Sequence, residues 1–125
     1  MVLAIAGAAC TSVSPLANGA KTADALATAV LDALARADRQ GLEALAVTER
    51  EFEDHVWPDL PAARPERNLP VSYVWGDLHQ KSGLRLTETL MKHGGTRYQL
   101  KAVRFAGETR YARYLVHRNA TFDVV

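Results

Sequence analysis

An alternating pattern at the C-terminal end constrains the fold of this chain more than any other feature. From residue 112 onward, apolar side chains occupy one register and mostly polar side chains occupy the other. The apolar register comprises Ala112, Tyr114, Val116, Ala120, Phe122 and Val124. A period of two residues is typical of a strand with one buried face. We therefore expect a strand hairpin over residues 98–125, with the second strand starting near Thr109 and a turn around Gly107.

Helical periodicity precedes these strands. Thr22 is a side-chain cap for a first helix, and Gly41 is expected to end it in the left-handed conformation. A second helix follows toward Trp57, and the capping-box sequence that begins at Thr48 predicts a break there. The chain therefore places its helices before its sheet.

A third helix is expected to begin at Pro70, after a connection rich in proline. Its apolar residues fall at helical spacing, namely Val71, Val74, Trp75 and Leu78. We expect Gly83 to separate it from a fourth helix, in which Leu86, Leu90 and Met91 face inward. The expected fold class is α+β, with one domain over residues 22–125.

We expect residues 1–21 to form a leader followed by a tether. Cys10 is the only cysteine, so the chain has no intramolecular disulfide. Small residues lead to Cys10, and a Ser/Pro/Asn/Gly-rich stretch follows it. This arrangement resembles the end of a bacterial lipoprotein signal peptide. The resemblance implies lipidation of Cys10, which would be the only membrane anchor, and a location in the bacterial cell envelope, periplasmic or extracellular. The alternative is the small-residue N-terminus of a cytoplasmic protein.

Charge is distributed unevenly along the chain. Residues 1–63 contain four Lys/Arg and nine Asp/Glu, whereas residues 64–125 contain eleven and five. Basic and aromatic residues alternate in the strands, as in some nucleic-acid-binding surfaces. However, Lys101 and Arg104 fall on opposite faces of one strand, as do Arg113 and Arg118 of the other. The pattern therefore argues against nucleic-acid binding.

The order of elements over residues 22–125 resembles the cystatin-like α+β roll of the nuclear transport factor two-like superfamily. The phrase from Ala37 to Leu45 is similar to the segment that joins the first two helices of that superfamily. The resemblance implies a curved antiparallel sheet wrapped around helices, with a cone-shaped pocket between them. Members carry further strands after these, so the resemblance implies that C-terminal strands are missing here. The superfamily includes isomerases, dehydratases and non-catalytic binding domains, so the resemblance is compatible with any of these functions.

Aromatic and histidine side chains are the candidates for a binding site. Trp57 and Trp75 are expected either to line an apolar cavity or simply to pack in the core. His79 lies at the edge of the helical stripe. It is expected to be either an acid or base at the mouth of a pocket or a half-buried packing residue. His117 shares a strand register with Tyr111. We expect the side chains of this register either to line the floor of a pocket or to face solvent.

No metal or cofactor site is expected, because the pair Glu51 and His55 lacks a third ligand at recognisable spacing. The leading hypothesis is a non-enzymatic envelope domain that binds a small apolar ligand or an envelope protein in the roll cavity. The first alternative is a cofactor-independent isomerase or dehydratase that uses His79 or His117. The second is a structural module that binds a partner, or a second copy of itself, through an exposed strand edge.

Overall fold

The computed structural model describes Leu16 and residues 19–125 and has mixed α+β architecture. The leader expected around Cys10 lies outside the described residues. The α-helices are α1 (Ala23–Ala35), α2 (Arg39–Ala44), α3 (Glu49–Glu51) and α4 (Val71–His93). A π-helical turn η3 (Phe52–Val56) follows α3, and three 3-10 turns come after it: η4 (Trp57–Asp59), η5 (Pro61–Ala63) and η6 (Pro65–Arg67). The strands are β1 (Leu100–Arg104), β2 (Gly107–Arg110), β3 (Leu115–Arg118) and β4 (Thr121–Val124).

Helix α1 supplies most of the buried core. Its N-cap is Thr22, whose hydroxyl accepts a hydrogen bond from the Ala25 amide at 3.0 Å, as the sequence predicts. Among the described residues, the buried apolar side chains are Ala27, Leu31, Ala33, Leu34 and Phe52. All but Phe52 belong to α1, which packs against β1, α2 and α4.

The first helix ends earlier than predicted. The left-handed residue is Ala37, at φ 50°, and Gly41 lies inside α2. The amides of Ala37 and Asp38 donate to the carbonyls of Leu34 and Ala33 at 2.9 Å each, which is a Schellman termination. The prediction of a stop at Gly41 is wrong because an alanine takes the conformation that glycine usually supplies. Asp38 then caps α2 by accepting from the Gly41 amide at 2.9 Å.

The break at Thr48 is confirmed. Its hydroxyl accepts a hydrogen bond from the Glu51 amide at 3.2 Å, so a new helix begins after α2 has ended at Ala44. The prolines that follow sit at the starts of short 3-10 turns, where their missing amide hydrogen costs nothing. Pro70 then precedes α4 as its N-cap residue.

Helix α4 runs unbroken through Gly83, so the predicted separation into two helices is wrong. An interior glycine costs a helix only about 0.5–1 kcal/mol relative to alanine. At Gly83 the carbonyl also accepts hydrogen bonds from Thr87 Oγ1 at 3.1 Å and Arg39 Nη2 at 3.4 Å. Met91 was expected to face inward but is 83% exposed.

The four strands form one long antiparallel hairpin in two sections. β1 pairs with β4 and β2 pairs with β3. The hairpin is confirmed, but its turn lies at residues 111–114, where the Tyr111 amide donates to the Tyr114 carbonyl at 2.9 Å, and not around Gly107. The expected continuous strand from Thr109 is interrupted by this turn and again at Asn119, whose φ of 52° is left-handed.

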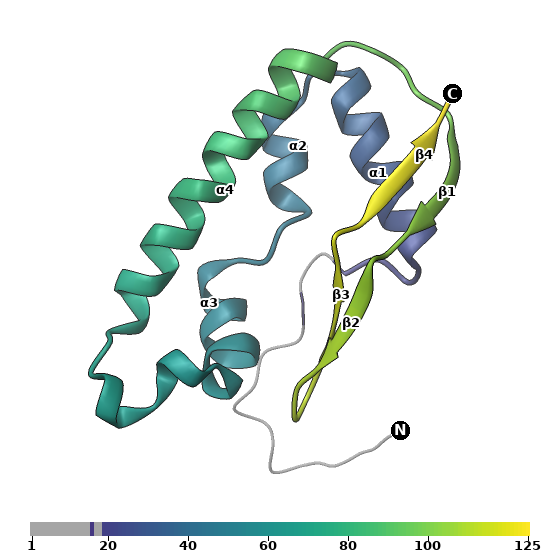
Figure 1. The fold of residues 1–125 in the computed structure, drawn as a ribbon. Coiled ribbons are helices and arrows are strands. Elements are labelled where there is room, and N and C mark those ends of the chain that lie inside the picture. Colours follow the sequence, from purple (N-terminus) through teal and green to yellow (C-terminus); the bar gives the residue numbers. More distant parts are fainter. Residues whose placement is uncertain (1–15, 17–18) are drawn as a thin grey trace.

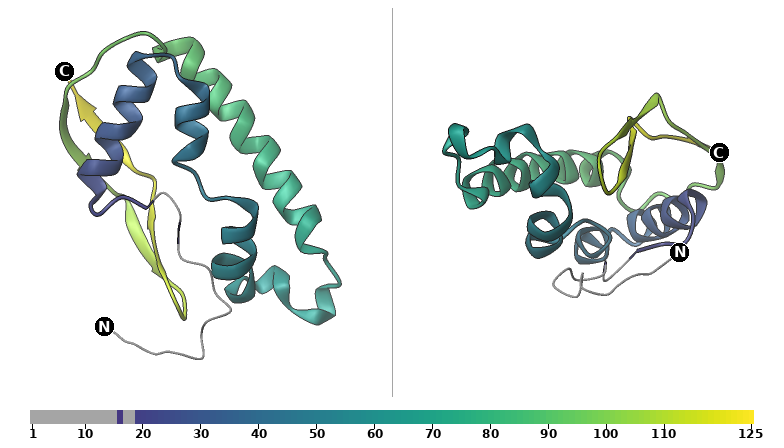
Figure 2. Two further views of the ribbon diagram at one scale, coloured as in Figure 1. Left: turned by 180° about the vertical axis from the view of Figure 1, so that it is seen from behind. Right: turned by 90° about the horizontal axis from the view of Figure 1, so that it is seen from below.

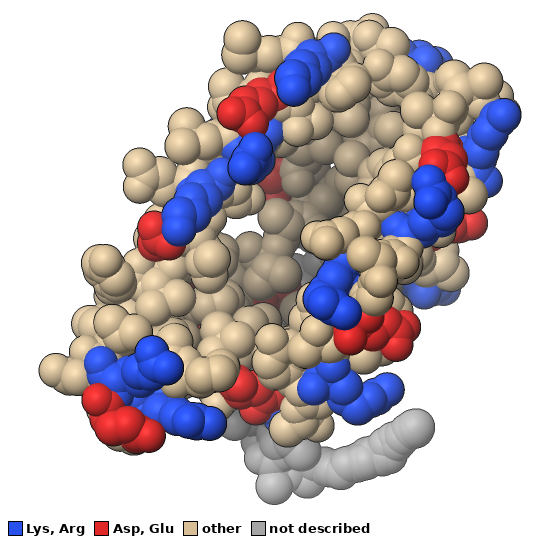
Figure 3. All heavy atoms as spheres, viewed as in Figure 1, with Lys and Arg blue, Asp and Glu red and all other residues tan. Residues whose placement is uncertain are grey.

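Helix α4 and the hairpin lie over opposite ends of the same face of the row formed by α1, α2 and α3 (Figures 1 and 2). The space-filling view shows that this face is hollowed between α4 and the strands (Figure 3). Within the described residues, no helix has the length and apolar character required to cross a bilayer.

Candidate functional site

A concavity with apolar walls lies between α2 and α4 and has a volume of about 840 Å³. This volume falls in the range typical of small-molecule sites. Apolar groove walls are formed by Leu42, Ala46, Val47, Trp75, Leu78 and Leu86. Polar or charged lining residues are Arg39, Glu43, Thr48, Glu49, His79 and Ser82. The lining therefore combines apolar walls with six polar or charged side chains.

A chain of aromatic contacts positions the groove. The ring of buried Phe52 lies 6.3 Å from Trp57 and 5.4 Å from Trp75, measured between ring centroids. Trp75 in turn stacks on His79, with a centroid separation of 5.4 Å and an interplanar angle of 24°. Because Phe52 belongs to η3 and Trp75 to α4, these contacts hold α4 against the segment that follows α2.

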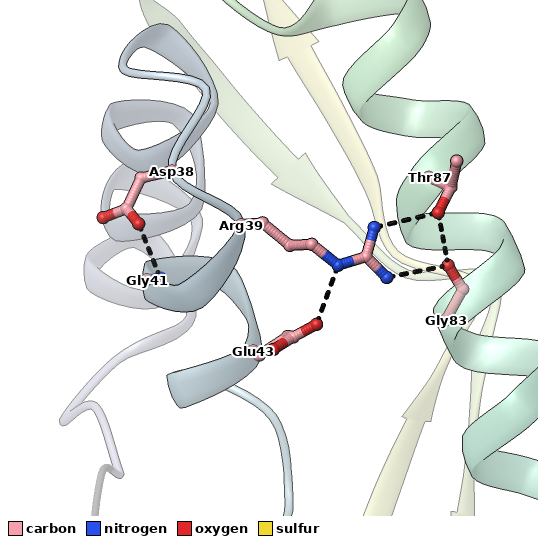
Figure 4. Close-up of polar contacts among 6 residues, drawn as sticks. All are labelled: Asp38, Arg39, Gly41, Glu43, Gly83 and Thr87. Atoms are coloured by element: carbon pink, nitrogen blue, oxygen red, sulfur yellow. Dashed lines mark hydrogen bonds and ion pairs between the residues drawn. The ribbon is translucent and has the colours of Figure 1, made fainter.

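Arg39 bridges the two walls at the other end of the groove (Figure 4). Its Nη1 donates to Thr87 Oγ1 at 2.8 Å, and its Nη2 donates to the Gly83 carbonyl at 3.4 Å. Its Nε bonds Glu43 Oε1 at 2.9 Å, one turn further along α2. The guanidinium therefore joins α2 to α4 through its two Nη atoms, while Nε holds Glu43 within α2.

His79 lies in this groove, as expected for a residue at the edge of the α4 stripe. Its ring is engaged by Trp75 through stacking. Within residues 19–125, no carboxylate or tyrosine hydroxyl forms a hydrogen bond with the His79 ring. The groove therefore offers an aromatic surface at His79 and does not pair the imidazole with a second proton-transfer group.

His117 lies far from the groove, on β3 of the hairpin. Its Nδ1 lies 3.3 Å from Glu108 Oε1 on β2, and its ring packs 4.7 Å from Phe105. Both members of the pair are exposed, with 45% of the His117 side chain and 57% of the Glu108 side chain accessible. Water therefore reaches both members of this imidazole–carboxylate pair, whereas proton-transfer sites commonly exclude water.

Tyr111 lies at the hairpin turn, where it stacks on Tyr114 at 4.7 Å. The Tyr114 hydroxyl donates to the Val56 carbonyl at 3.4 Å, and Arg113 forms an ion pair with Asp59 at 3.5 Å. Burial raises the pKa of Tyr114 above its ordinary value, with smaller contributions from Tyr111 and Asp59. These contacts dock the hairpin tip onto η3 and η4, and they place Tyr111 outside the groove.

The structure thus brings together Trp75 and His79, with Trp57 connected to them through Phe52. Tyr111 and His117 belong to the hairpin instead. Sequence reasoning missed the α2 side of the groove, including Arg39 and Glu43. The sequence predicted a helix after Gly41, but nothing in its spacing specified α4 as the partner.

Metal binding receives no support from the geometry. Glu51, the last residue of α3, is buried, with 8% of its surface exposed. In the part of the chain that the structure describes, no three His, Cys, Asp or Glu residues cluster closely enough to hold a metal ion.

No family model matches this chain, and comparisons with curated proteins and with solved structures give no match.

Proposed function

We propose that this protein is a non-enzymatic binding domain whose α2–α4 groove holds a small apolar ligand. The observation that carries the proposal is the half-buried indole of Trp75 in the wall of a groove of about 840 Å³. Leu78 and Leu86 of α4 and Leu42 of α2 extend the apolar lining. Burial of an apolar ligand there gains roughly 25 cal/mol per Å² removed from water.

The arrangement of the histidines favours binding over catalysis. A general acid or base must lie within hydrogen-bonding reach of the group it serves, and is usually oriented by a further polar partner. Among the described residues, the neighbour that stacks on His79 is the ring of Trp75, which is not a polar partner. The His117–Glu108 pair lies on an exposed strand surface. The alternative of an isomerase or dehydratase therefore gains no support from the groove.

A fluorescence titration tests the proposed function. Trp57→Phe leaves Trp75 as the only tryptophan, so its emission reports on the groove. A neutral apolar probe, N-phenyl-1-naphthylamine, should quench this emission by energy transfer in a saturable manner. Leu78→Asp should abolish saturation because it places a charge in the apolar wall, whereas Leu84→Asp on the exposed face of α4 should not. Equal binding by both variants would contradict the proposal.

A location in the cell envelope is part of the same proposal. It is supported by the small residues before Cys10 and the polar tether after it. Expression of the full chain in a bacterium should place it in the membrane fraction, and Cys10→Ser should release it. Unchanged fractionation of the variant would contradict lipidation.

A cone-shaped roll, as in the nuclear transport factor two-like superfamily, is the finer architecture that we propose. The helix-first order and the hollow between α4 and the hairpin support it (Figure 3). Association of two copies, or of a partner chain, through the hairpin edges is consistent with sheets of only two strands. Sedimentation of the purified chain over a range of concentrations tests self-association.

A further inference from the structure

The charges that line the α2–α4 groove do not balance. The carboxylate of Glu43 is held by Arg39 Nε at 2.9 Å, so these two residues neutralise each other. Counting histidine as neutral, Glu49 then supplies the remaining formal charge of the lining. Over residues 19–125, no cationic side chain forms an ion pair with Glu49. The groove lining therefore carries one unbalanced negative charge, at Glu49.

The position of Glu49 places this negative charge at one end of the groove. Glu49 begins α3, which lies beside the N-terminal part of α4, whereas α2 lies further along α4 (Figure 1). Trp75 lies near the start of α4, and Leu86 lies eleven residues later at the α2 end. The groove thus runs from Glu49 and Trp75 at one end to Leu86, beside Arg39 and its partner Glu43, at the other.

An indole and a carboxylate together favour a cation. The face of a tryptophan ring attracts ammonium groups electrostatically, by about 0.5–1 kcal/mol at an exposed site and more when water is excluded. A carboxylate without an ion-pair partner adds Coulomb attraction, which salt weakens. An anionic headgroup would meet repulsion from Glu49 at the same place.

We propose that the ligand of the α2–α4 groove is an amphiphilic cation, an alkyl chain that ends in an amine or quaternary ammonium group. The alkyl chain lies along Leu42, Leu78 and Leu86, and the cationic head lies near Glu49 and Trp75. This inference rests on the proposed function, because it names the class of ligand for the same groove.

Three probes with the same alkyl chain test the charge preference. The Trp57→Phe protein is titrated with octyltrimethylammonium, octanol and octyl sulfate, each below its micellar concentration, with Trp75 emission as the readout. We expect the ammonium probe to bind roughly fivefold tighter than octanol, from the cation–π and Coulomb contributions. Octyl sulfate should bind more weakly than octanol. Higher salt should reduce only the ammonium advantage.

Glu49→Gln identifies the residue responsible. The variant should lose most of the ammonium advantage while its affinity for octanol stays unchanged. Glu53→Gln is the matched control, because Glu53 is an exposed carboxylate on η3 outside the groove lining. Equal affinities for the three probes, or an ammonium advantage that survives Glu49→Gln, would overturn the inference and leave the apolar groove intact. Failure of all three probes and of the neutral naphthylamine to bind would overturn the proposed function itself.

Discussion

Arg39 Nη1 and Thr87 Oγ1 lie 2.8 Å apart, although the two residues are 48 positions apart in the chain. This hydrogen bond joins the first turn of α2 to the C-terminal half of α4. Arg39 also holds the Gly83 carbonyl and Glu43, so one side chain sets the spacing of the two groove walls (Figure 4).

Replacement of Arg39 by methionine should widen the groove. The variant keeps the aliphatic stem but removes three polar contacts. Because the Arg39 side chain is 43% exposed, we expect a modest loss of about 0.5–1.5 kcal/mol in the free energy of unfolding. Affinity for the neutral naphthylamine should fall severalfold. Arg36→Met is the control, because the Arg36 ion pair is with Asp38 and does not reach α4. Identical behaviour of the two variants in urea unfolding and probe titration would contradict the bridging role.

Replacement of Ala37 by glycine should stabilise the protein. Ala37 occupies the left-handed C′ position after α1 at φ 50°, a conformation that carries a steric cost for any residue with a Cβ atom. We expect a gain of roughly 0.5–1 kcal/mol, seen as a higher midpoint in urea. Ala29→Gly, in the interior of α1, should lose a similar amount. A loss of stability from both substitutions would be inconsistent with the Schellman termination.

The hairpin tip should detach at alkaline pH. Burial raises the pKa of Tyr114, so the folded state retains the phenolic proton that the unfolded state releases. The stabilisation is complete below the ordinary tyrosine pKa of about 10 and is lost as pH rises through the raised pKa. Tyr114→Phe should remove this contribution to the pH dependence of unfolding, and Tyr73→Phe, on an exposed face of α4, should retain it. An unchanged alkaline slope in Tyr114→Phe would contradict the assignment.

At acid pH, the pair of β1 and β4 should weaken. Arg104 donates to both carboxylate oxygens of Asp123 at 2.8 Å, and these hydrogen bonds lower the pKa of Asp123. Their stabilisation is present above the ordinary aspartate pKa and is lost as pH falls through the lowered value. Asp123→Asn should flatten the acid limb of the stability profile. Arg104→Gln should flatten it equally, and the double variant should add nothing further. Additive effects would show that the two residues act independently.

Local signals predicted the helix starts well, because each depends on residues close in sequence. Thr22 and Thr48 cap helices through amides three residues away, so their roles were readable from spacing alone. Gly83 was misread for the opposite reason. Its tolerance within α4 depends on packing and on Arg39, which comes from a distant part of the chain.

The strands show the same division between local and distant causes. Alternation identified the hairpin, but the position of the turn depends on the docking of Tyr114 against Val56, 58 residues away. The interruption at Asn119 is a backbone conformation that the apolar register does not encode. Helical periodicity likewise predicted that Trp75 and His79 lie close together on one helix. It did not indicate that α2 forms the other wall of the groove.

An amide-resolved NMR titration of the ¹⁵N-labelled protein with the neutral naphthylamine tests the account most directly. The proposed binding site requires saturable shift changes at the Trp75 indole and at residues of both walls, such as Leu42 and Leu86, with little change at Tyr114 and His117. Shift changes confined to the hairpin, or none up to the solubility limit of the probe, would contradict a binding site between α2 and α4.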